Sequence, residues 1–298
     1  TPAAAGEARI VYDVAHPRPW GKMIASYLWT KSIAAGVLLV AALLSSLGTL
    51  RGTALLNLAS PLLALLFLGA TVLLLIFDLK RPERFLFLLL KPNFKSWLVL
   101  GGYILLCYGI LASLWLFWGF TRGAVPAVLL WLAAMLAAGS AGYSAFLFAQ
   151  AKARDFWQSP LFLWHLLIQA ITAGSAILIM FAALLHAGST VIETLAKMMS
   201  GSLTLTLAVI LGEFWLTPVS EDVKRATDLL KRGALSGRFW AGVIGVGVLL
   251  PIVLLLWSIF ATVDYAAPLC FLASVLALIG LWIFEDLWVE AGQAVPLS

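Results

Sequence analysis

Residues 23–50 read MIASYLWTKSIAAGVLLVAALLSSLGTL, an apolar stretch long enough to cross a lipid bilayer as one helix. Crossing about 30 Å of hydrocarbon takes about 20 helical residues. Further stretches of this kind, separated by short polar loops, lie near residues 54–77, 97–120, 124–149, 161–186, 198–217, 239–263 and 267–287. The sequence therefore predicts an all-α integral membrane protein with eight transmembrane helices.

The composition supports this class of protein. Hydrophobic residues make up 63% of the 298 residues and charged residues only 11%, whereas soluble domains carry about 25% charged residues. Backbone groups within lipid must be satisfied inside the segment or in a closed barrel. The apolar stretches are much longer than the strands of about ten residues that build outer-membrane barrels, so helices are the expected structure.

The distribution of positive charge predicts the orientation of the chain. An even number of spans places both termini on one side, and the loops on that side hold 15 of the 19 Lys and Arg residues. These are Arg9, Arg18, Lys22, Lys80, Arg81, Arg84, Lys91, Lys95, Lys152, Arg154, Lys224, Arg225, Lys231, Arg232 and Arg238. The opposite loops hold Arg51, Arg122 and Lys197, and Lys31 lies within a span. Because Lys and Arg gather in cytoplasmic loops, both termini are expected in the cytoplasm of a bacterial or archaeal cell, with the chain in its inner membrane. The net charge of +5 then reflects topology and not a nucleic-acid surface.

A short internal similarity suggests two halves. Residues 33–36 of the first span read IAAG, and residues 171–174 of the fifth span read ITAG. The two spans enter the membrane in the same direction. We therefore expect a first four-helix bundle with the amino-terminal segment in residues 1–150 and a second four-helix bundle in residues 151–298.

Two loops have helical character. Residues 78–95 are partly apolar and could lie as a short helix at the membrane surface. Residues 221–238 form the most polar stretch and are expected to be an amphipathic helix. Neither loop is long enough to be a catalytic domain.

The residues that usually ligate prosthetic groups are few. Cys107 and Cys270 both lie within predicted spans and do not form a Cys-x-x-Cys motif, which argues against an iron–sulfur cluster. His165 and His186 share one predicted helix and are about 31 Å apart along it, so they cannot ligate one haem. The third histidine, His16, lies in the amino-terminal segment. We expect no haem, iron–sulfur cluster or metal in this chain.

Ionisable residues within hydrocarbon are costly and are therefore functional candidates. The candidates are Lys31, Asp78 and Glu213, and they share the terminal half of the membrane with Tyr27, Tyr143 and His165. Lys31 could instead be a structural ion-pair partner of Asp78 or Glu213. Glu285 and Asp286, at the end of the last span, are expected to be solvated.

Titratable groups at one membrane face, surrounded by aromatic residues, suit a quinone. Reduction of a quinone consumes two electrons and two protons, so its site needs hydrogen-bond donors and a route for protons. Tyr27, Tyr143, Lys31 and His165 can donate hydrogen bonds to the ring. Two alternatives stay open at this point: a proton or ion transporter that uses Lys31, Asp78 and Glu213, and a passive membrane anchor.

Several short motifs resemble a known family. They are residues 33–36 (IAAG), residues 78–85 (DLKRPERF), Pro92-Asn93 with Ser96-Trp97, and Ser159-Pro160. Together they resemble the NrfD/PsrC family, the membrane subunits of polysulfide-reductase-like complexes, over essentially the whole chain. The resemblance implies an eight-helix subunit of two four-helix bundles without a prosthetic group of its own. It also implies electron exchange between the menaquinone or ubiquinone pool and a ferredoxin-like iron–sulfur subunit, usually connected to a molybdopterin catalytic subunit.

The resemblance extends to few individual residues. Tyr143 matches a tyrosine near the end of span four that contacts the quinone in family members. Some members have a histidine early in span one, where this chain has Tyr27, four residues before Lys31. We therefore expect Tyr143, Tyr27 and Lys31 to bind the ring, with Lys31 as a candidate replacement donor, and Asp78, His165 and Glu213 to relay protons. Several members dock their partner outside the cell, which differs from the side that the charge count predicts for these residues.

Overall fold

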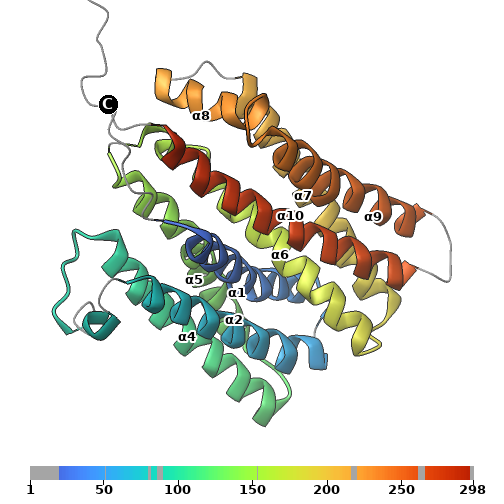
Figure 1. Ribbon diagram of the computed structural model, residues 1–298. Coiled ribbons are helices and arrows are strands. Elements are labelled where there is room, and N and C mark those ends of the chain that lie inside the picture. Colours follow the sequence, from blue (N-terminus) through green and yellow to red (C-terminus); the bar gives the residue numbers. More distant parts are fainter. Residues whose placement is uncertain are drawn as a thin grey trace, which may run out of the picture.

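The computed structural model describes residues 20–50, 52–79, 82–85, 90–152, 154–215, 220–260 and 266–295. Within these residues, eight helices are long and apolar enough to cross a membrane, which confirms the predicted fold class (Figure 1). They are α1 (Lys22–Ser46), η1 with α2 (Leu55–Ala59 and Ser60–Asp78), α4 (Trp97–Arg122), α5 (Ala127–Ala149), α6 (Phe162–Leu184), α7 (Ser189–Trp215), η4 with α9 (Arg238–Leu249 and Leu250–Phe260) and α10 (Ala266–Ala294).

Short helices lie between the spans. The amphipathic helix expected after the sixth span is confirmed as α8 (Glu221–Lys231), where the Ser220 side chain accepts a hydrogen bond from the Val223 amide. Ser220 thus caps the amino terminus of α8, and the acidic residues of the first turn interact favourably with the positive end of the helix dipole. In the loop of residues 78–95 the structure describes only part of the chain, including the 3₁₀ helix η2 (Pro82–Arg84). Another 3₁₀ helix, η3 (Asp155–Gln158), precedes α6.

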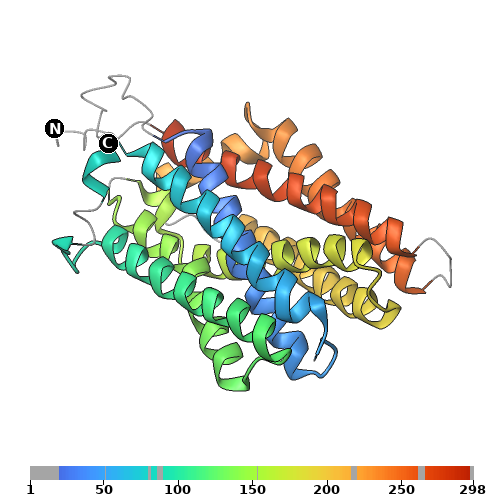
Figure 2. The same cartoon turned by 90° about the horizontal axis from the view of Figure 1, so that it is seen from below.

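Helix α1 lies at the centre of the bundle and packs against α2, α5, α6 and α10 (Figures 1 and 2). In its most apolar 18-residue window, 83% of the residues are buried, the highest share of any described span. Since α1 is apolar on all its faces, it can be surrounded by other helices. Polar residues in the middle of α1, such as Lys31 and Ser32, therefore face protein and not lipid.

Helices α1 and α6 approach each other closely at two glycines. A Cβ atom on Gly36 would lie 1.8 Å from the carbonyl oxygen of Ala170, and one on Gly174 would lie 2.1 Å from the carbonyl carbon of Gly36. Small residues allow helices to approach this closely in membranes, where dispersion contacts drive association. The two similar segments, IAAG and ITAG, thus face each other, while the division into two bundles stays a prediction.

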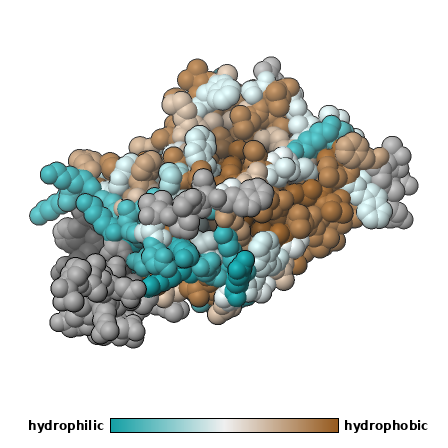
Figure 3. Space-filling model, turned by 90° about the horizontal axis from the view of Figure 1, so that it is seen from above, coloured by the Kyte–Doolittle hydropathy of each residue, from teal (hydrophilic) through white to brown (hydrophobic). Residues whose placement is uncertain are grey.

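The two ends of the bundle differ in polarity. Trp20 and Gln293 exchange hydrogen bonds of 3.0 and 2.7 Å, so α1 begins and α10 ends at one end, called here the terminal end. On the face shown in Figure 3, most of the hydrophilic surface gathers towards that end, and hydrophobic residues cover much of the middle. Exposed apolar side chains, such as Phe117 on α4 and Trp257 on α9, are positioned to meet lipid.

Candidate functional site

Two tyrosines and a lysine meet between α1 and α5. The hydroxyl groups of Tyr27 and Tyr143 are hydrogen-bonded to each other. The Lys31 ammonium donates to the carbonyl oxygen of Ala141 at 2.8 Å and to the hydroxyl of Ser144 at 2.6 Å. We call Tyr27, Lys31, Tyr143 and Ser144 the tyrosine–lysine cluster. It unites three of the residues predicted from the sequence to bind a ligand.

Local sequence explains how the cluster forms. Tyr27 and Lys31 are four residues apart on α1, so their side chains lie on the same face of the helix. The ammonium of Lys31 lies 4.9 Å from the ring centre of Tyr143 and 5.9 Å from that of Tyr27, within the range of cation–π attraction. On α4, Gly101 leaves space for the Tyr143 ring, because a Cβ atom there would lie 2.2 Å from it. All four cluster residues are buried.

Glu285 on α10 is an unexpected neighbour of this cluster. It is fully buried, and among the described residues neither of its carboxyl oxygens has a hydrogen-bond partner. Its charge interacts with that of Lys31. The expectation that Glu285 is solvated was therefore wrong. The spacing of the sequence could have indicated this burial. Glu285 follows Leu278 and Leu281 by seven and four residues, so the three residues share one face of α10, and both leucines are buried.

Hydrogen bonds from two tryptophans hold α10 against α1. The indole of Trp29 on α1 donates to the carbonyl of Leu278 at 2.9 Å, and that of Trp282 on α10 donates to the hydroxyl of Ser26 at 3.1 Å. On α1 both contacts, at Ser26 and Trp29, lie between Lys31 and the terminal end, and they fix the two helices in register. Glu285 is thereby kept in the interior next to α1.

Asp286 was also expected to be solvated, and this too was wrong. Its side chain is mostly buried and forms an ion pair with Arg238 at the start of η4. Arg238 also contacts Glu290 at 3.1 Å and is itself about half exposed. Asp286 and Glu285 are adjacent in sequence but point into different environments. The first belongs to a rim ion pair, and the second to the buried site.

A second polar cluster joins α6 to α7. The imidazole Nε2 of His165 lies 3.1 Å from a carboxylate oxygen of Glu213, and the hydroxyl of Ser159 donates to the other oxygen at 2.9 Å. The Glu213 side chain is 19% exposed, whereas the His165 side chain is fully buried. The His165 ring stacks against Phe284, with ring centres 5.3 Å apart. His165 thus lies beside the residue that precedes Glu285.

Asp78 lies apart from both clusters. It ends α2 and is partly exposed. The hydroxyl of Thr71 on the same helix donates to that of Thr30 at 3.0 Å, and Asp78 follows Thr71 by seven residues, or about 10 Å along the axis. No hydrogen bond or ion pair among the described residues joins Lys31 to Asp78 or to Glu213. The described residues therefore provide no contact for the alternative ion pair of Lys31, and none that would join the three residues in a single transport site.

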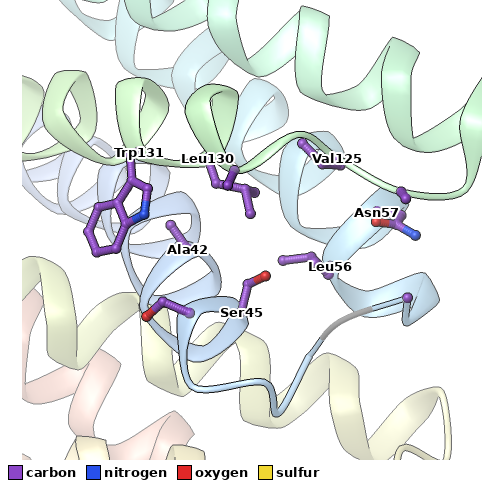
Figure 4. Close-up of a pocket in the computed structure, with 11 residues that line it drawn as sticks. Ala42, Ser45, Leu56, Asn57, Val125, Leu130 and Trp131 are labelled. Carbon is purple, nitrogen blue, oxygen red and sulfur yellow. The ribbon is translucent and has the colours of Figure 1, made fainter.

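A pocket among the described residues lies at the end of the bundle opposite the terminal end (Figure 4). Its volume is about 410 Å³, and its lining includes Ala42, Ser45, Leu56, Asn57 and Trp131. Ligand pockets usually measure about 300–1,000 Å³. Ala42 follows Lys31 by 11 residues, or about 16 Å along α1. The pocket contains none of the residues predicted from the sequence to bind a ligand.

The chemistry that these residues can perform is hydrogen bonding and proton transfer. Phenol hydroxyls, an ammonium, a carboxyl and an imidazole gather in the terminal half of the bundle, around the junction of α1, α5, α6 and α10. Within the described part of the chain, no group of three or more His, Cys, Asp or Glu side chains is arranged to hold a metal ion. The arrangement suits a ligand that accepts hydrogen bonds and exchanges protons.

Comparison with known proteins assigns the chain to a family. A family model described as polysulphide reductase, NrfD, matches residues 11–296. The sequence is also similar to the C subunit of the polysulfide reductase of Wolinella succinogenes. The two are 27% identical over 269 residues, which cover 79% of this chain and 82% of that protein.

Proposed function

This chain belongs to the polysulphide reductase NrfD family, and on that basis we propose that it is a quinone-binding membrane subunit of a respiratory oxidoreductase. In this proposal the chain exchanges electrons between the menaquinone or ubiquinone pool and an iron–sulfur partner subunit, with uptake or release of protons. The observation that supports it best is the tyrosine–lysine cluster, where two phenols and an ammonium lie together in a buried site.

The cluster offers the interactions that a quinone requires. The Tyr143 hydroxyl would donate a hydrogen bond to a ring oxygen, and Tyr27 would hold that hydroxyl in place through their mutual hydrogen bond. The ammonium of Lys31 would stabilise the negative charge that develops on the ring oxygens during reduction, an effect that is large in a site of low polarity. Trp97 and Phe146 stack at 4.4 Å one turn beyond Tyr143 and supply an aromatic wall for a planar ring.

Polar groups between the tyrosine–lysine cluster and the terminal end support a route for protons. Glu213 reaches the surface and contacts His165, which is buried. Asp78 lies near the terminal end and could serve as an additional acceptor from water. We propose that His165 and Glu213 relay protons to the site, with Asp78 at its entrance.

We propose that the partner is a ferredoxin-like iron–sulfur subunit, itself connected to a molybdopterin catalytic subunit. The distribution of 15 Lys and Arg residues against three supports cytoplasmic termini in an inner membrane. Purification in mild detergent, followed by quinone extraction and identification of bound proteins, tests the assignment. A quinone with an iron–sulfur subunit is the expected result, and a homo-oligomer that contains neither would contradict it.

Replacement of Tyr143 by phenylalanine is expected to reduce quinol turnover of the intact complex by about tenfold or more, because one donor to the developing charge is lost. The matched control is Tyr108→Phe, which removes another buried phenol hydroxyl, one that donates to the carbonyl of Ala34. The control should keep turnover near the wild-type value. Equal turnover of the Tyr143 variant and wild type would contradict the proposed site.

The pocket at the end of the bundle opposite the terminal end is the alternative location for the quinone ring. Trp131 lines that pocket and is about half exposed, so Trp131→Ala alters it without touching the tyrosine–lysine cluster. We expect this variant to retain its bound quinone. Loss of quinone from the Trp131 variant but not from the Tyr143 variant would move the site to the pocket.

A further inference from the structure

Two oppositely ionisable side chains lie buried together on helices from opposite ends of the chain. Lys31 on α1 and Glu285 on α10 are both completely inaccessible to solvent. Lys31 directs its described hydrogen bonds to α5, at Ala141 and Ser144. Neither carboxyl oxygen of Glu285 has a hydrogen-bond partner in the part of the chain that the structure describes. A carboxyl in this position is not explained by packing or by a structural hydrogen-bond network.

The energetics restrict the charge that the two groups can hold. A single charge within a membrane protein costs several kcal/mol unless it is paired. Lys31 and Glu285 avoid that cost when the two side chains together bind one titratable proton, because the pair then has no net charge. Ammonium with carboxylate and amine with carboxyl contain the same number of protons, and both forms have no net charge. A proton can therefore be present on either side chain of the pair.

Groups that could carry protons lead from this pair to the terminal end. The buried Nδ1 atom of His165 and the side-chain oxygen of Gln169, one turn further along α6, both lack hydrogen-bond partners among the described residues. Gln169 and Phe284 line a cavity of about 20 Å³, and about 10–15 Å³ is enough for one water molecule. On the outer side, His165 contacts the partly exposed Glu213. The described ion pairs include no direct contact between Lys31 and Glu285, so a water molecule or a rotation of the Glu285 side chain must bridge them.

We propose that Lys31 and Glu285 form a buried proton-binding pair that supplies protons to the quinone and is refilled from the terminal end through His165 and Glu213. This inference rests on the proposed function and adds to it a specific proton donor, Glu285.

The proton and electron count balances. Two electrons from the iron–sulfur partner and two protons convert the quinone to the quinol. Each proton leaves the Tyr143 hydroxyl for a ring oxygen, and the phenol regains one from Lys31 through Ser144, whose hydroxyl interacts with both. The pair is then an amine with a carboxylate, and it regains one proton from water at the terminal end: the Glu285 carboxylate accepts this proton and passes it to the Lys31 amine. Quinol oxidation is the same sequence reversed.

The test compares Glu285→Gln with Glu290→Gln in the intact complex. Glu290 lies five residues further along α10, at the surface, in the ion pair with Arg238. Glu285→Gln is expected to lower quinol turnover by about a hundredfold, as loss of a proton-transfer group does, with quinone still bound. The infrared difference spectrum between oxidised and reduced complexes should lose a protonated-carboxyl band that shifts in D₂O. Glu290→Gln should change neither measurement.

A second variant covers the case in which Glu285→Gln alone is unstable. Lys31→Met with Glu285→Gln removes both charges and should restore folding but not turnover. Bound quinone with wild-type turnover in Glu285→Gln or in the double variant would overturn the pair and leave the proposed function intact. A wild-type complex that binds no quinone and turns over no quinol would overturn both.

Discussion

Replacement of Gly36 by leucine is expected to prevent the chain from folding into its native bundle. The added Cβ atom would lie 1.8 Å from the carbonyl oxygen of Ala170 and 2.8 Å from the amide nitrogen of Gly174. These are backbone atoms, which no rotamer change can move, so α1 and α6 would have to separate. Overpacking in ordinary cores costs about 1–3 kcal/mol, and a clash between two backbones should exceed that range.

The measurement is the yield and thermal midpoint of monodisperse protein in detergent. Gly69→Leu is the matched control, because Gly69 lies on α2 within a span and a Cβ atom there would meet nothing within 4 Å. The control should be produced in wild-type amounts with an unchanged midpoint. A Gly36 variant with the same yield and midpoint would show that the two helices do not pack as described.

Replacement of Lys31 by methionine is expected to lower the free energy of unfolding by about 3–5 kcal/mol, the usual effect of leaving one member of a buried charge pair alone. Methionine preserves most of the side-chain volume, so the effect arises from charge. Glu285 would then lie buried without its only described electrostatic partner. Unfolding of the detergent-solubilised protein by a denaturing detergent measures the loss.

A double-mutant cycle shows whether the effect belongs to the pair. Lys31→Met combined with Glu285→Gln should recover at least half of the lost stability, because no uncompensated charge remains. Lys197→Met serves as the control, since Lys197 forms an exposed ion pair with Glu193 at 2.6 Å and such pairs contribute about 0.5 kcal/mol or less. Strictly additive effects of the two buried substitutions would show that Lys31 and Glu285 do not interact.

Part of the candidate site could be predicted from sequence. The spacing of Tyr27 and Lys31 places them on one face of a helix, and Tyr143 lies at a similar depth in the membrane on another span. Contacts among the three could therefore be predicted, and the structure contains them. Which charges meet could not be predicted in this way. Asp78 and Glu213 were the ion-pair partners considered as an alternative for Lys31, but Glu213 contacts His165. Lys31 interacts electrostatically with Glu285, at the far end of the sequence.

The sequence by itself determined the eight spans and the asymmetry of charge between the two ends. Lipid offers the backbone no hydrogen bonds, so each span must satisfy its own polar groups, and this makes the fold class readable from local composition. The tertiary structure alone decided that α1 is central, that Gly36 meets Gly174, and that Glu285 is buried and interacts electrostatically with Lys31. These outcomes depend on how each helix is rotated about its axis and on which helices pack against it. The composition of nearly uniformly apolar helices does not specify either, and small residues and buried polar groups decide the packing.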